Sequence, residues 1–190
     1  MYNCNIAFLN AYQGAPGVYI SFGTLNKFHL KFCEHTASHY LPTVPVFMQI
    51  LSERNTPLFK TRITLTPGEK TLIAITGYGS SINAVKIPSP IMPRRPDRAY
   101  IRFINLSSLG PVSLLQKGSA VFSQVELCEK TNYILSAPGT YLFTIKAPSV
   151  TKTIEVTANA GDYKTIYFTG NRISNKAIIL CERKASAPGY

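Results

Sequence analysis

The amino-acid sequence predicts an all-β protein that consists of two β-sandwich domains in tandem. Short runs in which apolar and polar residues alternate are separated by turns rich in Gly and Pro, the pattern of half-buried strands. No stretch keeps a helical period over a useful length, and one series of short motifs occurs twice in the 190 residues. Two sandwiches of roughly 90 residues each account for this length.

The strands expected in the first copy follow from these patterns. Phe28, Leu30 and Phe32 alternate with polar residues, which predicts a strand with one buried face. The continuous apolar run at 72–75 predicts a central strand that is covered on both sides. The full expected set covers residues 6–10, 18–22, 28–32, 46–51, 59–65 and 72–75, with turns at 14–17 and 67–68.

The second copy repeats this plan at a nearly constant spacing. Phe8 and Phe103 lie 95 residues apart in similar strands. The other matched motifs are Asn10 with Asn105, Cys33-Glu34 with Cys128-Glu129, Gly68-Glu69 with Gly161-Asp162, and Thr76-Gly77 with Thr169-Gly170. We expect a first module at 1–88, a Pro-rich linker at 89–98, a second module at 99–184 and a flexible tail at 185–190.

The charges exclude some classes of partner. The formal net charge is +11, although charged residues make up only 15% of the chain. The basic excess is +4 over 1–88 (7 minus 3), +2 over 89–98 (3 minus 1) and +5 over 99–184 (10 minus 5). A specific nucleic-acid binder usually concentrates Lys and Arg on one element, so we expect no specific nucleic-acid partner. A spread positive field can still attract an acidic polymer.

The start of the chain shows no secretory signal. Met1–Phe8 lacks a basic region followed by a long apolar segment. The longest apolar runs are too short to span a bilayer. We therefore expect a protein that is made without a signal peptide and is not inserted into a membrane.

Several motifs resemble a bacterial repeat family. Phe122–Val125, Thr131–Tyr133 and Ala137–Tyr141 are similar to the repeat described as domain of unknown function 4397, whose modules open with a strand like Ile101–Asn105. Gly14–Tyr19 resembles the Ser-Pro-x-Ala-Pro-like turn of that family.

The two copies also depart from this family pattern. The first copy has Leu41–Pro45 where the family has a Pro-Gly-Thr-Tyr hairpin, and the second has only Ser107–Pro111 at the earlier turn. The resemblance implies tandem immunoglobulin-like or transthyretin-like β-sandwich domains, found on exported or cell-surface bacterial proteins. Tandem forms without a signal peptide resemble those of spore-forming bacteria. The family has no established catalytic residues, so the resemblance assigns none.

All three histidines fall in one segment that also holds a cysteine. His29, Cys33 and His35 would share a face if this segment were one strand, and imidazole with thiolate suits zinc or copper. In the second copy only the cysteine, Cys128, is retained, so the module does not need a metal to fold. We therefore expect no metal or other cofactor, with these three residues as weak candidates.

No pattern indicates an enzyme active site. Among nine acidic residues only Glu126 and Glu129 lie close together, and on an alternating strand they would face opposite ways. Cys33 and His35 are too near each other in sequence for a spatially assembled dyad. We therefore expect no catalytic residues.

The four cysteines, Cys4, Cys33, Cys128 and Cys181, are far apart in the sequence. Because there is no CxxC pair, the sequence does not predict a zinc ribbon, and three disulfide pairings remain open. In a reducing cytoplasm the four would be small buried side chains. Alternatively, Cys33 and Cys128 could serve covalent assembly, and Cys4 could reach a neighbouring subunit with Cys181 as the acceptor.

Two functions are compatible with these patterns. The first is a non-enzymatic structural protein of a bacterial surface or spore layer, or of the cytoplasm otherwise. It would self-associate, or bind other layer proteins, through sheet edges and Cys bridges. The alternative is a module that binds carbohydrate or an acidic polymer through tyrosines near turns, namely Tyr12, Tyr19, Tyr40, Tyr78 and Tyr133.

Overall fold

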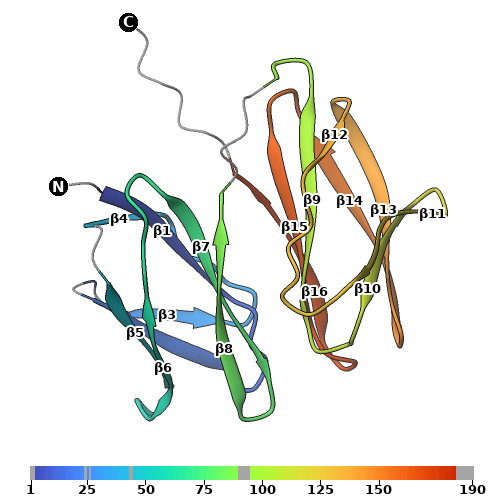
Figure 1. The fold of residues 1–190 in the computed structure, drawn as a ribbon. Helices are drawn as coiled ribbons and strands as arrows, with labels where there is room; N and C mark the ends of the chain where they lie inside the picture. Colours follow the sequence, from blue (N-terminus) through green and yellow to red (C-terminus); the bar gives the residue numbers. More distant parts are fainter. Residues whose placement is uncertain (1–2, 24, 26, 43–44, 90–94, 183–190) are drawn as a thin grey trace, which may run out of the picture. The chain divides into compact units, whose positions relative to one another are not determined.

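The computed structural model describes residues 3–23, 25, 27–42, 45–89 and 95–182 (Figure 1). These residues form sixteen β-strands and the turns between them, without a helix. The strands make four sheets of four strands, two in each half of the chain. The predicted all-β class with two β-sandwiches is confirmed.

The first sandwich consists of strands β1 to β8. Sheet I has the order β4-β1-β7-β8 and sheet II the order β3-β2-β5-β6. The strands are β1 (Asn3–Asn10), β2 (Gly17–Phe22), β3 (Phe28–Lys31), β4 (His39–Pro42), β5 (Val46–Ser52), β6 (Pro57–Ile63), β7 (Lys70–Tyr78) and β8 (Ser81–Pro88). β1 pairs in parallel with β7, whereas the partners at the sheet edges are antiparallel.

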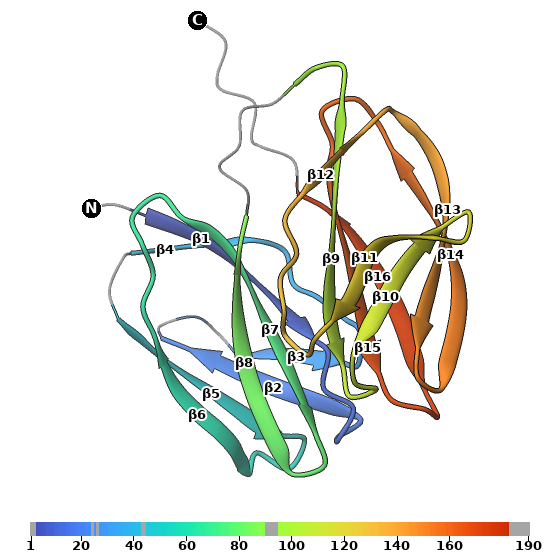
Figure 2. The same cartoon turned by 45° about the vertical axis from the view of Figure 1, so that its right-hand side comes forward.

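The second sandwich consists of strands β9 to β16 in the same order. Sheet III is β12-β9-β15-β16 and sheet IV is β11-β10-β13-β14 (Figure 2). The strands are β9 (Ala99–Ser107), β10 (Val112–Gln116), β11 (Ser119–Val125), β12 (Ile134–Ser136), β13 (Gly139–Ala147), β14 (Val150–Ala158), β15 (Tyr163–Gly170) and β16 (Asn175–Cys181).

Side-chain alternation explains where each core lies. On β1 and β7, Phe8 and Ile73 point between sheets I and II and are fully buried. On β9 and β15, Phe103 and Phe168 do the same between sheets III and IV. β9 is buried at all nine positions, so it is a central strand covered on both faces. The strands predicted from continuous apolar runs are therefore the central ones.

The same hydrogen bonds occur in both sandwiches. A residue of β1, β3, β4 or β5 corresponds to the residue 95 positions later in the second sandwich. From β6 to β8 the corresponding residue lies 93 positions later. The Asn10 side chain donates to Leu30 O at 3.0 Å, and the Asn105 side chain donates to Val125 O at 3.0 Å. The backbone N–H groups of Cys33 and Cys128 donate to O of these two asparagines, each at 2.7 Å. Equivalent side chains thus hold equivalent turns.

Removing either buried asparagine is expected to destabilise its sandwich. Asn10→Ala or Asn105→Ala leaves a strand-end carbonyl without this donor, which lowers the free energy of unfolding by about 1–3 kcal/mol. Urea unfolding measures the loss. The exposed Asn132→Ala serves as the control, with a change below about 0.5 kcal/mol. An equally small loss for Asn10→Ala would contradict the role assigned to the amide.

The chain divides into two compact units. The first contains Met1–Ser89 together with the short segments Leu106–Ser108 and Thr169–Asn171, and the second contains the rest. The predicted modules at 1–88 and 99–184 placed these two short segments in the second module. Residues 90–94 of the predicted linker and the whole predicted tail at 185–190 lie outside the described residues.

Some elements differ from the sequence-based expectation. The strand expected at 28–32 ends at Lys31, because Cys33 adopts a positive φ of 70° in a tight turn. β4, β8 and β12 were not expected. They lie at sheet edges, where exposed polar residues hide the alternation.

Candidate interaction surface

The three weak metal candidates do not come together. His29 lies on β3, which ends before Cys33, so the expectation that His29, Cys33 and His35 share a strand face is wrong. His29 Nε2 lies 3.6 Å from Glu53 Oε1, and its ring lies 4.7 Å from that of Tyr19. Among the residues that the structure describes, no group of three or more His, Cys, Asp or Glu side chains could hold a metal ion.

The cysteines differ in their accessibility. All four are free. Cys4 is 1% exposed and its Sγ donates to Leu41 O at 3.3 Å. The expectation that Cys4 reaches a neighbouring subunit is therefore wrong. Burial raises the pKa of the Cys4 and Cys128 thiols, which makes both less reactive. Cys181 on β16 is exposed, so four buried thiols are also a wrong expectation.

The paired glutamates serve a turn. Glu126 and Glu129 were expected to face opposite ways on a strand, but β11 ends at Val125. Glu129 Oε2 accepts a hydrogen bond from the Glu126 backbone N–H at 2.8 Å. The equivalent Glu34 carboxylate accepts from Lys31 N at 2.8 Å. These carboxylates stabilise the turns that hold Cys33 and Cys128.

Two of the five turn tyrosines are not available to a ligand. Tyr12 is 4% exposed and its hydroxyl donates to Gly79 O. Tyr133 is half-buried, and its ring is occupied by contacts with Arg102 and Tyr163. Tyr40 and Tyr78 are 73% and 71% exposed, and Tyr19 is half-buried. The expected set of binding tyrosines is therefore reduced to these three.

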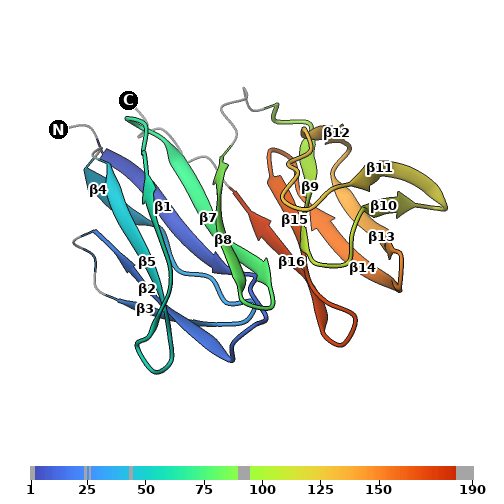
Figure 3. The same ribbon diagram turned by 60° about the horizontal axis from the view of Figure 1, so that its bottom comes forward.

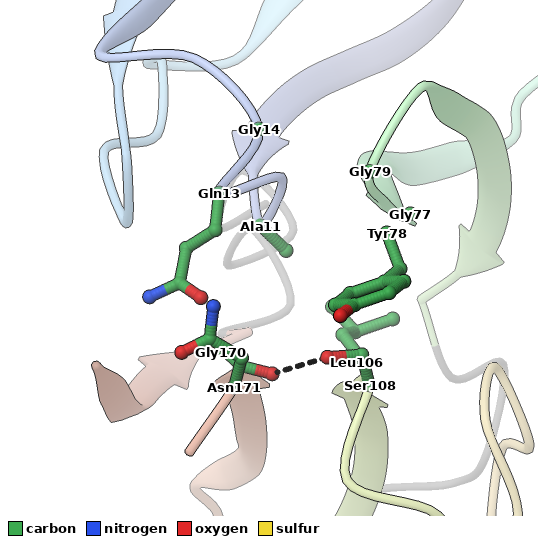
Figure 4. A pocket seen from close by; sticks show the side chains of 10 residues that line it. All are labelled: Ala11, Gln13, Gly14, Gly77, Tyr78, Gly79, Leu106, Ser108, Gly170 and Asn171. Atoms are coloured by element: carbon green, nitrogen blue, oxygen red, sulfur yellow. Dashed lines mark hydrogen bonds between the residues drawn. The ribbon is translucent and has the colours of Figure 1, made fainter. Parts of the chain in front are cut away.

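A pocket lies in the first compact unit. It has a volume of about 70 Å³, and Figure 4 shows Gln13 and Tyr78 on opposite sides of it. Its lining residues are Ala11, Gln13, Gly14, Gly77, Tyr78, Gly79, Leu106, Ser108, Gly170 and Asn171. Ligand pockets typically exceed roughly 300 Å³. This pocket has room for a few water molecules and does not enclose a sugar ring.

The second sandwich contains a buried ion pair that the sequence did not predict. Arg102 on β9 is 6% exposed, and its Nη2 lies 3.0 Å from Glu182 Oε1. Its Nε donates to Thr165 Oγ1 at 2.9 Å, and the Thr165 hydroxyl donates to Glu182 Oε1 at 2.9 Å. Tyr167 OH donates to the same carboxylate oxygen at 3.2 Å. Three donors therefore converge on Oε1 of this carboxylate.

Aromatic rings surround this ion pair. The Tyr133 ring centroid lies 4.6 Å from the Arg102 guanidinium carbon, a cation–π contact. The Tyr133 ring also meets the Tyr163 ring edge-on at 5.6 Å. Tyr163 in turn stacks on Tyr100 at 4.3 Å. The cluster is therefore packed on its aromatic side.

The electrostatics of the cluster suit a structural role. Burial raises the pKa of the Tyr133 and Tyr167 hydroxyls, and the nearby Glu182 carboxylate raises both further. Burial alone would lower the pKa of Arg102, but Glu182 raises it above its ordinary value. Near neutral pH the arginine thus stays charged and the tyrosines stay protonated.

The first sandwich has no such cluster at the equivalent positions. Ala7 and Ala74 stand there in place of Arg102 and Tyr167. The signal in the sequence was a lone arginine inside an apolar run that reads as a central strand. The partner could not be read from the sequence, because Glu182 is 80 residues away.

The outer face of sheet II combines cations with an exposed aromatic ring. On β5 Phe47 is 60% exposed, and it lies opposite Arg62 of β6 in the strand register. The Lys60 ammonium lies 5.2 Å from the Phe47 ring centroid. Lys31 and His29 project from β3 on the same face. This face is open and positively charged.

The outer face of sheet IV has a different composition at the same positions. Leu142 of β13 is 63% exposed and lies opposite Glu155 of β14. Threonines occupy most of the remaining outward positions of these two strands. Thr140 and Thr157 lie opposite each other, with their hydroxyls 3.1 Å apart. The face is uncharged apart from Glu155 and Lys146.

Most edge strands carry features that disfavour the addition of another chain. β3, β4 and β12 are only three or four residues long, and β11 shifts register twice against β10 (Figure 3). On β8, Lys86 Nζ lies 2.7 Å from Glu69 Oε2 and donates to Thr64 O at 2.9 Å. On β14, Lys152 points to the core side and donates to Asn175 O at 3.2 Å. Charges placed in this way oppose edge-to-edge pairing.

Comparison with known proteins adds no family. No protein-family model matches the chain, and no curated protein matches it. The resemblance to the bacterial repeat family therefore stays a prediction. Within the described residues there is no helix that is long and apolar enough to cross a bilayer.

Proposed function

We propose that this chain is a non-enzymatic structural protein of a bacterial surface or spore layer, built as a tandem repeat and assembled from copies of itself. The observation that carries the proposal is the pair Phe47 and Leu142, which are exposed at equivalent positions on two outer sheet faces. Single exposed apolar side chains are common, but their recurrence at one position of a flat face suits sheet-on-sheet contact. The resemblance to a bacterial surface repeat favours the location.

Association is assigned to sheet faces rather than to sheet edges. Most of the edges that the sequence suggested are short, bulged or occupied by lysines, whereas sheets II and IV present open outer faces. Cysteine bridges play a minor part, because Cys181 is exposed and Cys4 is buried. A single exposed thiol can link two chains but cannot build a network.

Sedimentation velocity over a range of protein concentrations tests self-association. We expect the mean mass to rise with concentration and to fall at most about twofold when reductant is added. Cys181→Ser should remove the effect of reductant and leave the rise with concentration unchanged. A monomer at every concentration, with and without reductant, would overturn the proposal.

The second candidate function is binding of carbohydrate or an acidic polymer. Lys60, Arg62 and Phe47 on sheet II favour it, because clustered cations beside an aromatic ring attract a polyanion. A chain that stays monomeric but binds polyglutamate in a salt-dependent manner would support this function instead.

A further inference from the structure

We propose that sheet II of one copy stacks on sheet IV of the next copy, so that the chain assembles head to tail. This inference rests on the proposed self-association and names the surfaces that carry it. Arg62 lies opposite Phe47 on sheet II, and Glu155 lies opposite Leu142 on sheet IV. Both sheets thus have an exposed apolar residue at the equivalent position. The residue beside it is positively charged on sheet II and negatively charged on sheet IV.

A second charge reversal lies at the other side of these sheets. Lys31 ends β3, and the equivalent Glu126 directly follows β11. Their equivalence is independent of the sequence match, because both backbone N–H groups donate to a carboxylate three residues ahead at 2.8 Å. Both side chains are exposed. At these two positions the first sandwich therefore carries cations, whereas the second carries Glu155 on sheet IV and Glu126 directly beside it.

Stacking these faces brings complementary groups together. Because the two sheets have the same strand order, a face-to-face arrangement can place Phe47 on Leu142 while Arg62 meets Glu155. Contacts between two copies of sheet II would instead bring arginine near arginine. Like-charge contacts of this kind are unfavourable. The charges thus favour the unlike pair of faces over either like pair.

The size of the faces predicts a weak contact. Strands of seven residues span about 23 Å, and four strands span about 19 Å, so each face covers roughly 440 Å² before side-chain relief is counted. Two such faces come close to the roughly 1,000 Å² that a specific interface needs. The contact should be reversible and should weaken at high salt.

The unlike faces also fix the type of assembly. Each chain offers one sheet II face and one sheet IV face, so the contact is heterologous. In a pair of chains, one copy keeps a free sheet IV face and the other keeps a free sheet II face. A heterologous contact extends into a filament or closes into a ring. It stops at a dimer only where the ring closes after two chains.

Charge-swap variants of the full chain test this pairing by sedimentation velocity at low salt. Arg62→Glu alone and Glu155→Arg alone should each reduce the association constant at least tenfold. The double variant Arg62→Glu/Glu155→Arg should regain most of it, and a mixture of the two single variants should assemble. Lys176→Glu and Asp97→Arg change charge by the same amounts elsewhere and should leave assembly unchanged.

The outcomes separate this inference from the proposed function. If the unaltered chain assembles and neither Arg62→Glu nor Glu155→Arg changes the association constant, the sheet II to sheet IV pairing is overturned and self-association is left intact. Loss in Arg62→Glu without loss in Glu155→Arg would overturn it, because Glu155 of sheet IV would then not be the partner of Arg62. A monomer that loses polyglutamate binding in Arg62→Glu would overturn it together with self-association, in favour of a polyanion partner.

Discussion

Glu182→Ala is expected to lower the free energy of unfolding of the second sandwich by about 3–5 kcal/mol. The substitution leaves the Arg102 guanidinium buried without its carboxylate, and it removes the acceptor of the Thr165 and Tyr167 hydroxyls. A buried charge without its partner is far less stable than the intact pair. Urea unfolding followed by circular dichroism measures the loss.

Two further variants show whether the ion pair or the lost packing is responsible. Arg102→Met/Glu182→Leu removes both charges together and should recover most of the stability, since a buried ion pair is often no better than apolar residues of similar size. Asp97→Ala breaks the exposed pair with Arg98 and should change stability by less than about 0.5 kcal/mol. A double variant as unstable as Glu182→Ala would contradict the explanation by an unpaired charge.

Phe8→Ala and Phe103→Ala are each expected to destabilise one sandwich by about 3–5 kcal/mol. Both rings are fully buried, and the Phe8 ring packs within 5.2 Å of Phe22 and 5.6 Å of Phe28, measured between centroids. Because each ring belongs to a separate core, each loss should stay within its own sandwich.

Hydrogen exchange measured by mass spectrometry locates these losses. Phe8→Ala should speed exchange in peptides from 3–89, and Phe103→Ala in peptides from 99–182. Labelling of the Cys4 thiol in urea measures unfolding of the first sandwich independently, because this buried thiol becomes accessible only on unfolding. If either variant accelerated both sets of peptides equally, the two cores would behave as one cooperative unit.

Much of the architecture could be predicted because central strands are the most apolar. The run at 72–75 lies inside β7, and the run at 6–10 lies inside β1, as expected. The edge strands β4, β8 and β12 were missed because edges expose polar residues and tolerate short lengths. The turns at Cys33 and Cys128 were missed because cysteine carries no turn preference, although both residues have a positive φ.

The candidate surface could be predicted less well than the fold. Nothing in a local pattern shows that Tyr12 is buried against Gly79, or that Lys86 points to Thr64, because these partners are distant in sequence. The charge reversals at Arg62 and Glu155 become visible only when strand register aligns the two copies. Long-range pairing therefore defines the surface, whereas local alternation defines the strands.

The distance in sequence between Arg102 and Glu182 also has a consequence for the order of folding. During synthesis the guanidinium emerges 80 residues before the carboxylate that neutralises it, so it must stay hydrated until Glu182, the residue directly after β16, has been made. The ion pairs His29–Glu53 and Lys86–Glu69 of the first sandwich join residues that are close in sequence, so neither delays its closure while the ribosome is translating the second. The second sandwich is thus complete only when its final strand has been made. A chain that stalls or is truncated before that point would expose the incomplete sandwich to proteolysis.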